Sequence, residues 1–471
     1  MNDEALALID ESLRFDAFNY GCRYEKYLIK QDERELTEMK EMLRKSSQNY
    51  DELALDYQAA GLDTEAEAIW NIAISEGAVS PMTYYYMGRY DEAVHADLSY
   101  CFPNRAEDII ALEAAKRLSP ADAHAPYLLG CLYYAARQYD LAIENWELSA
   151  RLDPKFPTVW RNLALGRFNK QERQQEALEY MERAFSLDEN DERILMELDQ
   201  LRKRLHHSHQ ERLTFLQKYP ELIQRRDDLV LEEITLLNQT GRYEEAMQKL
   251  DAHIFHPWEG GEGKVSAQYQ ISRVELAKQA LTRRDFEGAV RLLSECLDYP
   301  HHLGEGKLYG AQENDFHYLL GLAYERMGNV ETAHKYWEEA TKGPQEPAAA
   351  MYYNDAKPDK IFYQGLALYK LGREGEAHGR FYRLINYGKQ HIFEKQIMDY
   401  FAVSLPDLLI WEDSLDTKNL IHCKYMLALG YLGLGDNEHA QKYLAEVEAL
   451  DNNHQGIQQL RTLINTVLHS I

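Results

Sequence analysis

The feature that most constrains this chain is a pair of small residues that recurs at a fixed spacing. Six times, a Gly or Ala is followed twelve positions later by an Ala. The six pairs are Ala54 and Ala66, Gly130 and Ala142, Ala277 and Ala289, Gly321 and Ala333, Gly365 and Ala377, and Ala428 and Ala440. Four residues beyond each pair stands a large apolar residue, in turn Trp70, Trp146, Leu293, Trp337, Phe381 and Leu444. Antiparallel helices that cross at small residues approach closely, so this spacing predicts a series of helical hairpins.

The turns and the distance between hairpins agree with this prediction. In four units a glycine follows the first small residue by seven positions, at Gly61, Gly328, Gly372 and Gly435. Glycine suits the left-handed conformation in which a first helix would end. Ala54 and Gly88 are 34 residues apart, as are Gly130 and Ala164, and this period is typical of tetratricopeptide repeats. The sequence therefore predicts an all-α fold, an α-solenoid superhelix of tetratricopeptide and degenerate helical-hairpin repeats.

Between the clear units the pattern weakens without stopping. Leu198 and Ile234 belong to degenerate units, and 88–93 predicts a turn directly after a shortened first helix. The whole array amounts to about nine units. By regularity of sequence we divide the chain into degenerate N-terminal repeats at 1–118, central tetratricopeptide repeats at 119–250, and C-terminal repeats with long inserts at 251–471.

The C-terminal units are spaced more widely than the rest of the array. Each surplus falls after the second helix of one unit and before the first helix of the next, at 251–268, 300–315, 343–360 and 386–418. Equivalent connections in a solenoid emerge on one edge, so we expect these four inserts to form a contiguous rim. Inserts on one face of a repeat array are often its binding face.

Two of the inserts share the sequence Gly-Glu-Gly-Lys, at 261–264 and 304–307. One interpretation is a twin ligand clamp on the rim, in which Glu and Lys supply paired charges. The other is that each copy is a helix N-terminal turn fixed by glycine. Neither copy has the spacing of a nucleotide-binding phosphate loop. The candidate binding residues around the two copies are His256, Trp258, Glu259, Glu262, Lys264, Glu305, Lys307 and Tyr309.

Aromatic residues accompany these inserts. They are Trp258, Tyr309, Tyr352, Tyr353 and Trp411. Exposed aromatics beside Glu and His suit a sugar ring or a protein hot spot. Alternatively, they fill the gaps between widely spaced repeats. We expect the inserts at 251–268 and 300–315 to lie side by side and to form one site.

The sequence contains histidines that could bind a metal and glutamates that could act in catalysis, but their arrangement favours neither role. The histidines at 206, 207 and 209 and at 301–302 lack ligand spacing, and adjacent histidines on a helix point in different directions. Glu259, Glu262 and Glu305 are carboxylates of the kind that glycoside hydrolysis uses in pairs. Nothing in the sequence buries them or separates their pKa values. We therefore expect no metal, no cofactor and no enzymatic activity.

The chain is strongly acidic, with 52 Lys and Arg against 78 Asp and Glu and a formal net charge of −26. Such a charge repels nucleic acid and anionic membrane surfaces, so we expect neither as a partner. No apolar stretch reaches the roughly 18–20 residues of a membrane span, and Met1–Glu4 is acidic where a signal peptide would be basic. Five scattered cysteines argue against a disulfide framework. We expect a soluble protein of the reducing cytoplasm.

Four longer segments resemble a family of large bacterial tetratricopeptide proteins whose role is not established. They are 100–103, 156–163, 255–264 and 399–407, and the resemblance runs from about Leu13 to Asn453. In that family the helical array usually forms the C-terminal half and follows a β-rich domain that resembles sugar-binding supersandwich folds. The resemblance implies that this chain corresponds to the helical half, without the β-rich domain.

These observations predict a non-enzymatic protein-binding scaffold that uses a concave groove and the rim of inserts. The alternative is an accessory module of a carbohydrate-active system, which recognises a glycan or docks onto a sugar-processing β-rich domain. A catalytic role for the rim is the third interpretation. The expected partner is thus a protein or a β-rich sugar-processing domain, with the oligomeric state left open.

Overall fold

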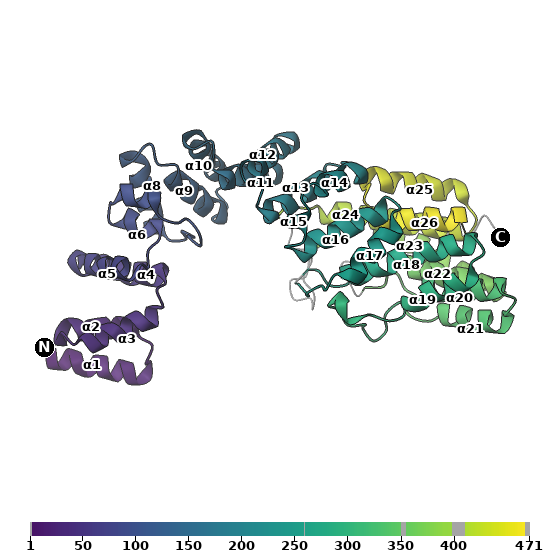
Figure 1. The fold of residues 1–471 in the computed structure, drawn as a ribbon, viewed down its shortest axis with the longest axis horizontal. Helices are drawn as coiled ribbons and strands as arrows, with labels where there is room; N and C mark the ends of the chain where they lie inside the picture. Colours follow the sequence, from purple (N-terminus) through teal and green to yellow (C-terminus); the bar gives the residue numbers. More distant parts are fainter. Residues whose placement is uncertain (1, 259, 350–354, 398–409, 467–471) are drawn as a thin grey trace. The chain divides into compact units, whose positions relative to one another are not determined.

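Every regular element in the described part of the chain is a helix, which confirms the predicted all-α solenoid. A computed structural model describes residues 2–258, 260–349, 355–397 and 410–466, and no strand occurs among them. The helices form two compact units, Met1–Leu187 and Asp188–Ile471 (Figure 1). The earlier division at 118 and 250 follows regularity of sequence and stays a prediction.

The first unit contains the helices α1 (Asn2–Phe15), α2 (Tyr20–Lys30), α3 (Glu33–Leu43), α4 (Ser47–Ala59), α5 (Asp63–Glu76), α6 (Pro81–Tyr86), α7 (Tyr90–His95), α8 (Ala106–Leu118), α9 (His124–Ala135), α10 (Tyr139–Leu152), α11 (Pro157–Gln171) and α12 (Gln174–Leu187). The second unit contains α13 (Glu192–Arg204), α14 (His209–Leu216), α15 (Pro220–Ile223), α16 (Asp227–Gln239), α17 (Tyr243–Ala252), α18 (Lys264–Thr282), α19 (Phe286–Glu295), the 3₁₀ helix η1 (His301–Leu303), α20 (Asn314–Arg326), α21 (Val330–Ala340), α22 (Pro358–Lys370), α23 (Glu374–His391), α24 (Leu415–Gly433), α25 (Asn437–Leu450) and α26 (Gln455–Thr466).

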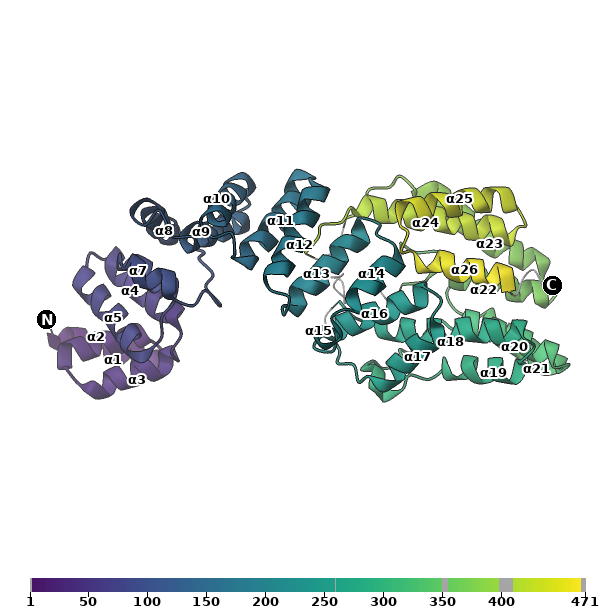
Figure 2. The ribbon, with the colours of Figure 1, turned by 45° about the horizontal axis from the view of Figure 1, so that its top comes forward.

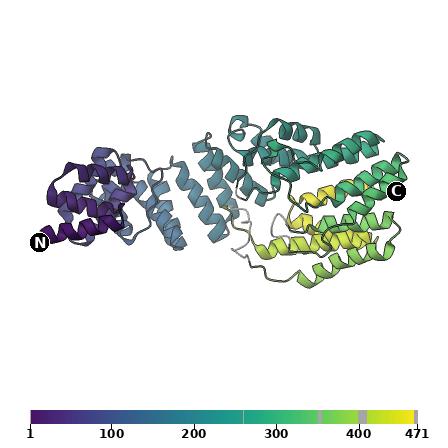
Figure 3. The same cartoon turned by 90° about the horizontal axis from the view of Figure 1, so that it is seen from below.

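The predicted hairpins are present in the predicted register. Within each unit, successive helices pack side by side (Figure 3). The six pairs α4/α5, α9/α10, α18/α19, α20/α21, α22/α23 and α24/α25 carry the six pairs of small residues. Each second small residue is fully buried, and each large apolar residue that follows it is at most 3% exposed.

The first small residue of a hairpin also lies against the large residue that follows the pair. A Cβ atom at Gly130 would lie 3.0 Å from the Ala142 carbonyl oxygen, at the predicted crossing, but closer still to the indole of Trp146. A Cβ at Gly321 would lie 2.2 Å from Nε1 of Trp337. A Cβ at Gly365 would likewise lie 2.4 Å from the ring of Phe381. The glycine therefore leaves room for the ring sixteen residues later.

The turns inside the hairpins adopt the left-handed conformation that the glycines predict. Gly61, Gly328, Gly372 and Gly435 have φ values between 74° and 82°. Two hairpins place an arginine at the same position, Arg137 with φ 61° and Arg284 with φ 64°. The shortened hairpin is also confirmed, because α6 and α7 have six residues each.

The second unit closes around its own C-terminal helix. Nε2 of Gln458 on α26 donates to the Gln239 carbonyl of α16 at 2.9 Å. Nζ of Lys278 on α18 donates to the Gln459 carbonyl of α26 at 2.9 Å. Leu463 of α26 is fully buried in the same core as α18, α20, α22 and α24. Helix α26 therefore lies among the first helices of the repeats (Figure 2), in the space that we expected to be an open groove.

The structure bears on two further expectations from the sequence. None of the helices in the described ranges combines the length and apolarity needed to cross a membrane. All five cysteines are described, and each is a free thiol.

Candidate functional site

The first two inserts lie side by side, as the sequence predicts. The backbone N–H of Phe255 in the first insert donates to the His302 carbonyl in the second at 2.8 Å. Gly304 has φ 71°, and a Cβ atom there would lie 2.5 Å from the Phe255 carbonyl oxygen. Glycine at 304 is thus required both by the backbone conformation and by the close approach of the first insert.

Glu305 joins the two inserts by capping helix α18. Its Oε2 accepts a hydrogen bond from the backbone N–H of Gly263 at 2.9 Å, and its Oε1 accepts one from the N–H of Val265 at 3.2 Å. The hydroxyl of Ser266 donates to the same carboxylate at 3.2 Å. The first N–H groups of a helix have no partner within the helix, and they form the positive end of its dipole. A carboxylate from the neighbouring insert satisfies them here.

The two Gly-Glu-Gly-Lys copies therefore have different roles. The first copy is a helix N-terminal turn, since Gly263 has φ 72° and Lys264 begins α18. This agrees with the second of our two interpretations. The second copy supplies the cap through Glu305, and Nζ of Lys307 pairs with Glu313 at 2.6 Å. Glu305 and Lys307 thus have partners in the fold and are not a free clamp.

The remaining candidate residues differ in exposure. Trp258 is half-buried, and its indole occupies the space next to Gly261, where a Cβ would lie 2.3 Å away. Glu262 is half-buried, and Glu259 lies outside the described residues. Tyr309 is fully exposed. Whether Trp258 and Tyr309 belong to one site stays a prediction.

His256 is held in place although its side chain is 81% exposed. Its backbone N–H and Nδ1 contact Oδ2 of Asp227 at 2.7 and 3.1 Å, and Nε2 of His253 contacts Oδ1 at 2.7 Å. Burial raises the pKa of Asp227, but the hydrogen bonds from the two histidines outweigh it and lower the pKa overall. The carboxylate therefore stays ionised and anchors the first insert to the start of α16.

Sequence patterns did not identify the exposed aliphatic residues of these inserts. Ile254 is 65% exposed and Leu308 is 47% exposed. A lone aliphatic residue in a loop carries no periodic signal, so only the structure reveals it. We use the name insert surface for the exposed side chains of Ile254, His256, Leu308 and Tyr309.

Of our candidate aromatic residues in the other inserts, the structure describes only Trp411, which is buried. Trp411 is 1% exposed, and its Nε1 donates to the Glu197 carbonyl of α13 at 2.9 Å. It fills a gap within the second unit, which was the alternative interpretation of these aromatics. Tyr352 and Tyr353 lie outside the described residues.

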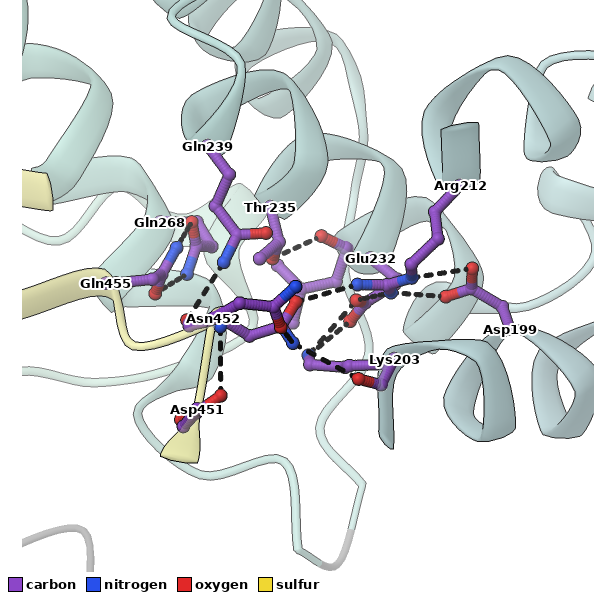
Figure 4. Close-up of polar contacts among 12 residues, drawn as sticks. Asp199, Lys203, Arg212, Glu232, Thr235, Gln239, Gln268, Asp451, Asn452 and Gln455 are labelled. Atoms are coloured by element: carbon purple, nitrogen blue, oxygen red, sulfur yellow. Dashed lines mark hydrogen bonds and ion pairs between the residues drawn. The ribbon is translucent and has the colours of Figure 1, made fainter. Parts of the chain in front are cut away.

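A buried polar network ties the end of the second unit to its beginning (Figure 4). The guanidinium of Arg212 is fully buried and contacts both carboxylate oxygens of Asp199, at 3.1 and 2.6 Å. It also pairs with Glu232, and its Nη1 donates to Oδ1 of Asn453 at 3.0 Å. Burial would raise the pKa of Glu232, but the charges of Lys203 and Arg212 lower it to about 2. Burial raises the pKa of the other carboxyl, Asp199, although the charge of Arg212 opposes that rise. The network holds the α25–α26 turn against α14 and α16.

The described residues contain no group of three or more His, Cys, Asp or Glu side chains placed to hold a metal ion. Nδ1 of His206 lies 3.2 Å from Oδ1 of Asn452. The Asn452 amide in turn donates to the His206 carbonyl at 3.1 Å. This histidine therefore takes part in closing the second unit.

No protein-family model matches the sequence. Among solved structures, the chain is similar to YrrB, a TPR protein with an unusual peptide-binding site, at 15% identity and a TM-score of 0.28, over 49% of this chain and 90% of that one. It is similar to a tetratricopeptide repeat protein from Parabacteroides merdae at 14% identity and a TM-score of 0.28, over 61% and 96% of the two chains. It is also similar to Naa15/Naa10 bound to HypK-THB at 12% identity and a TM-score of 0.27, over 100% and 98%.

At these identities the likeness concerns the fold alone. The helices of the described residues agree with the helical part of the resemblance. The β-rich domain that the resemblance associates with such arrays finds no support among the described residues, which form no strand.

Proposed function

We propose that this protein is a non-enzymatic, protein-binding repeat scaffold whose partner binds the insert surface. The observation that carries the proposal is the cap that Glu305 provides. It fixes two inserts of successive repeats to each other and to α18, while Ile254 and Tyr309 remain exposed. Exposed apolar and aromatic side chains on a preorganised backbone lose little entropy on binding, which favours affinity.

The interior of the second unit is a weaker candidate for the partner site. Helix α26 already contacts α16 and α18 there through Gln458 and Lys278. A partner would have to displace this helix and expose its buried leucines. The rim therefore supports the proposed function better than the groove does. The net charge of −26 favours a partner with a basic surface.

A photo-crosslinking amino acid at position 309 tests this proposal in the native host. We expect one specific protein to be crosslinked from position 309, and the same protein to be lost when Ile254→Asp is added. The matched control is position 382 on α23, because Tyr382 is 53% exposed but lies far in the sequence from the two inserts at 251–268 and 300–315. Equal crosslinking of the same protein from both positions would contradict the proposal.

The remaining details are also proposals. We infer that the protein acts in a reducing cytoplasm, which the free thiols suit. Recognition of a glycan or of a sugar-processing domain is the alternative partner class from the sequence. No contact among the described residues favours it.

A further inference from the structure

A second candidate site lies inside the second unit. A cavity of about 280 Å³ is lined by residues of α18, α20, α22, α24 and α26. These helices are the first helices of four repeats and the C-terminal helix (Figure 2). A cavity of this size is small for a drug-like ligand, and it suits a compact metabolite of few heavy atoms.

Two of the charges in this cavity neutralise each other. The ammonium of Lys360 pairs with Oδ1 of Asp315, and both side chains are 11% exposed. The two histidines of the lining, His422 and His454, add no charge at neutral pH, because burial lowers the pKa of each. The ion pair needs no ligand to balance it.

Two other charges in the lining have no such partner. Among the described residues, neither Lys357 nor Asp359 makes a hydrogen bond or an ion pair through its side chain. They flank Pro358, the first residue of α22. Burial of the ammonium lowers the pKa of Lys357, and the nearby charge of Asp359 offsets only part of that effect. The Lys357 side chain keeps exposed surface, and Asp359 is half-buried.

A third polar group also lacks a partner. Nδ1 of His454 is buried and has no hydrogen-bond partner within the described residues. Its ring packs on Tyr425 with the ring centroids 4.5 Å apart. Buried polar atoms in proteins are generally hydrogen-bonded, so an unsatisfied one in a cavity wall indicates a place for a polar ligand atom.

We propose that this cavity binds a small zwitterion of the α-amino acid class. The ligand carboxylate binds Lys357, and the ligand ammonium binds Asp359. The apolar wall formed by Ile271, Val274 and Phe316 receives the ligand side chain. A simple anion would meet Asp359 and a simple cation would meet Lys357, so a ligand that carries both charges is favoured over either.

Binding to the full-length protein tests this proposal. Each of the twenty standard amino acids is added alone at about 5 mM, and a rise in Tm is expected for at least one, because a ligand that binds only the folded state stabilises it. For that amino acid, the N-acetyl derivative, which lacks the ammonium, and the amide, which lacks the carboxylate, should both bind about tenfold more weakly or worse by calorimetry. No Tm rise with any amino acid, or undiminished binding of both derivatives, would overturn the proposal.

Two substitutions assign the two charges. Lys357→Met should weaken binding of the amino acid about tenfold but leave binding of its amide unchanged, because the amide lacks the carboxylate. Asp359→Asn should weaken binding of the amino acid about tenfold but leave binding of the N-acetyl derivative unchanged, because that derivative lacks the ammonium. The control is Lys335→Met, because that lysine is 71% exposed on α21 outside the cavity. Equal loss for all three ligands in either variant, or loss in the control, would show that the two charges do not contact the ligand.

Discussion

Two helical glycines show how differently one residue type is used in this chain. Gly321 lies against the indole of Trp337, whereas a Cβ at Gly379 on α23 would meet nothing within 4 Å. We predict that Gly321→Ala lowers the free energy of unfolding by about 1–3 kcal/mol, because the ring must move. Gly379→Ala should raise it by about 0.5–1 kcal/mol, because alanine is the better helix former. Urea denaturation of both variants measures this, and a gain in stability for Gly321→Ala would contradict the packing.

The turn arginines provide a second prediction at this scale. Arg137 occupies the left-handed position that glycine holds in four other hairpins, with φ 61°. Replacing a side chain by glycine there relieves strain but adds freedom to the unfolded chain. We expect Arg137→Gly to raise the free energy of unfolding by about 0.5–1 kcal/mol. As a control, Glu179→Gly on the exposed side of α12 should lower it by about 1 kcal/mol.

Asp51 gives the first unit a pH dependence. Its carboxylate is 6% exposed and accepts hydrogen bonds from Nε1 of Trp70 at 3.2 Å and from the hydroxyl of Thr83 at 3.1 Å. Burial raises its pKa from 3.8 to about 7, and the hydrogen bonds offset only part of that rise. The folded state therefore binds the proton more tightly than the unfolded state does.

The sign of the effect follows from linkage. The contribution of protonated Asp51 is fully present below the unfolded pKa and is lost as pH rises through the folded pKa, between about pH 4 and 7. We predict that the Tm of the wild type falls relative to that of Asp51→Asn across this interval. Calorimetry at several pH values measures the difference, and parallel Tm curves for the two proteins would contradict the raised pKa.

At the scale of single elements, the cap on α18 is the feature to test. Glu305→Ala removes the acceptor for the N–H groups of Gly263 and Val265. We expect a loss of about 0.5–2 kcal/mol in the free energy of unfolding, as for other helix caps. Hydrogen exchange of the amides at 263–266 should become faster. The control is Glu262→Ala, the equivalent position of the other Gly-Glu-Gly-Lys copy, which should change neither quantity.

The contrast between these two glutamates shows what the sequence can and cannot predict. The hairpins follow from spacings of seven, twelve and sixteen residues, because contacts inside a hairpin join residues that are close in sequence. The positions of the inserts follow from the same register. The partner of Glu305 lies about forty residues away in another insert, and no periodic pattern encodes it. Because the two Gly-Glu-Gly-Lys copies have the same sequence, we predicted the same role for both. In the structure the first copy is a helix N-terminal turn and the second supplies the cap.

Contacts between residues that are still farther apart in the sequence could not be predicted from it. Trp411 binds the Glu197 carbonyl, and Asn453 binds Arg212. Neither pair has a local signal, because each is formed only when the superhelix of the second unit closes. The cavity with Lys357 and Asp359 arises from the same closure. The candidate binding residues that we predicted from the sequence therefore do not include the residues of this cavity.

At the scale of the whole molecule, each of the two compact units has buried hydrophobic clusters of its own. In the first, Trp70 is 3% exposed and stacks on Tyr86 with ring centroids 5.7 Å apart. In the second, Leu463 of α26 is fully buried in a core that includes residues of α18 to α25. A helix repeat array transmits stability mainly between neighbouring repeats, so a defect in one unit need not weaken the other.

We therefore predict that core substitutions act on one unit at a time. Leu463→Ala should lower the free energy of unfolding of the second unit by about 2–5 kcal/mol, and Trp70→Ala should lower that of the first by about 3–5 kcal/mol. Hydrogen exchange at increasing urea measures the two units separately, through peptides of α2 and α4 for the first and of α20 and α21 for the second. Leu463→Ala should leave the first set of peptides unchanged, and Trp70→Ala should leave the second unchanged.

If either substitution weakened both sets together, the chain would unfold as one cooperative block. Loss of protection limited to α26 itself would contradict the closure of the second unit around this helix, because a helix that only covers the core could detach alone.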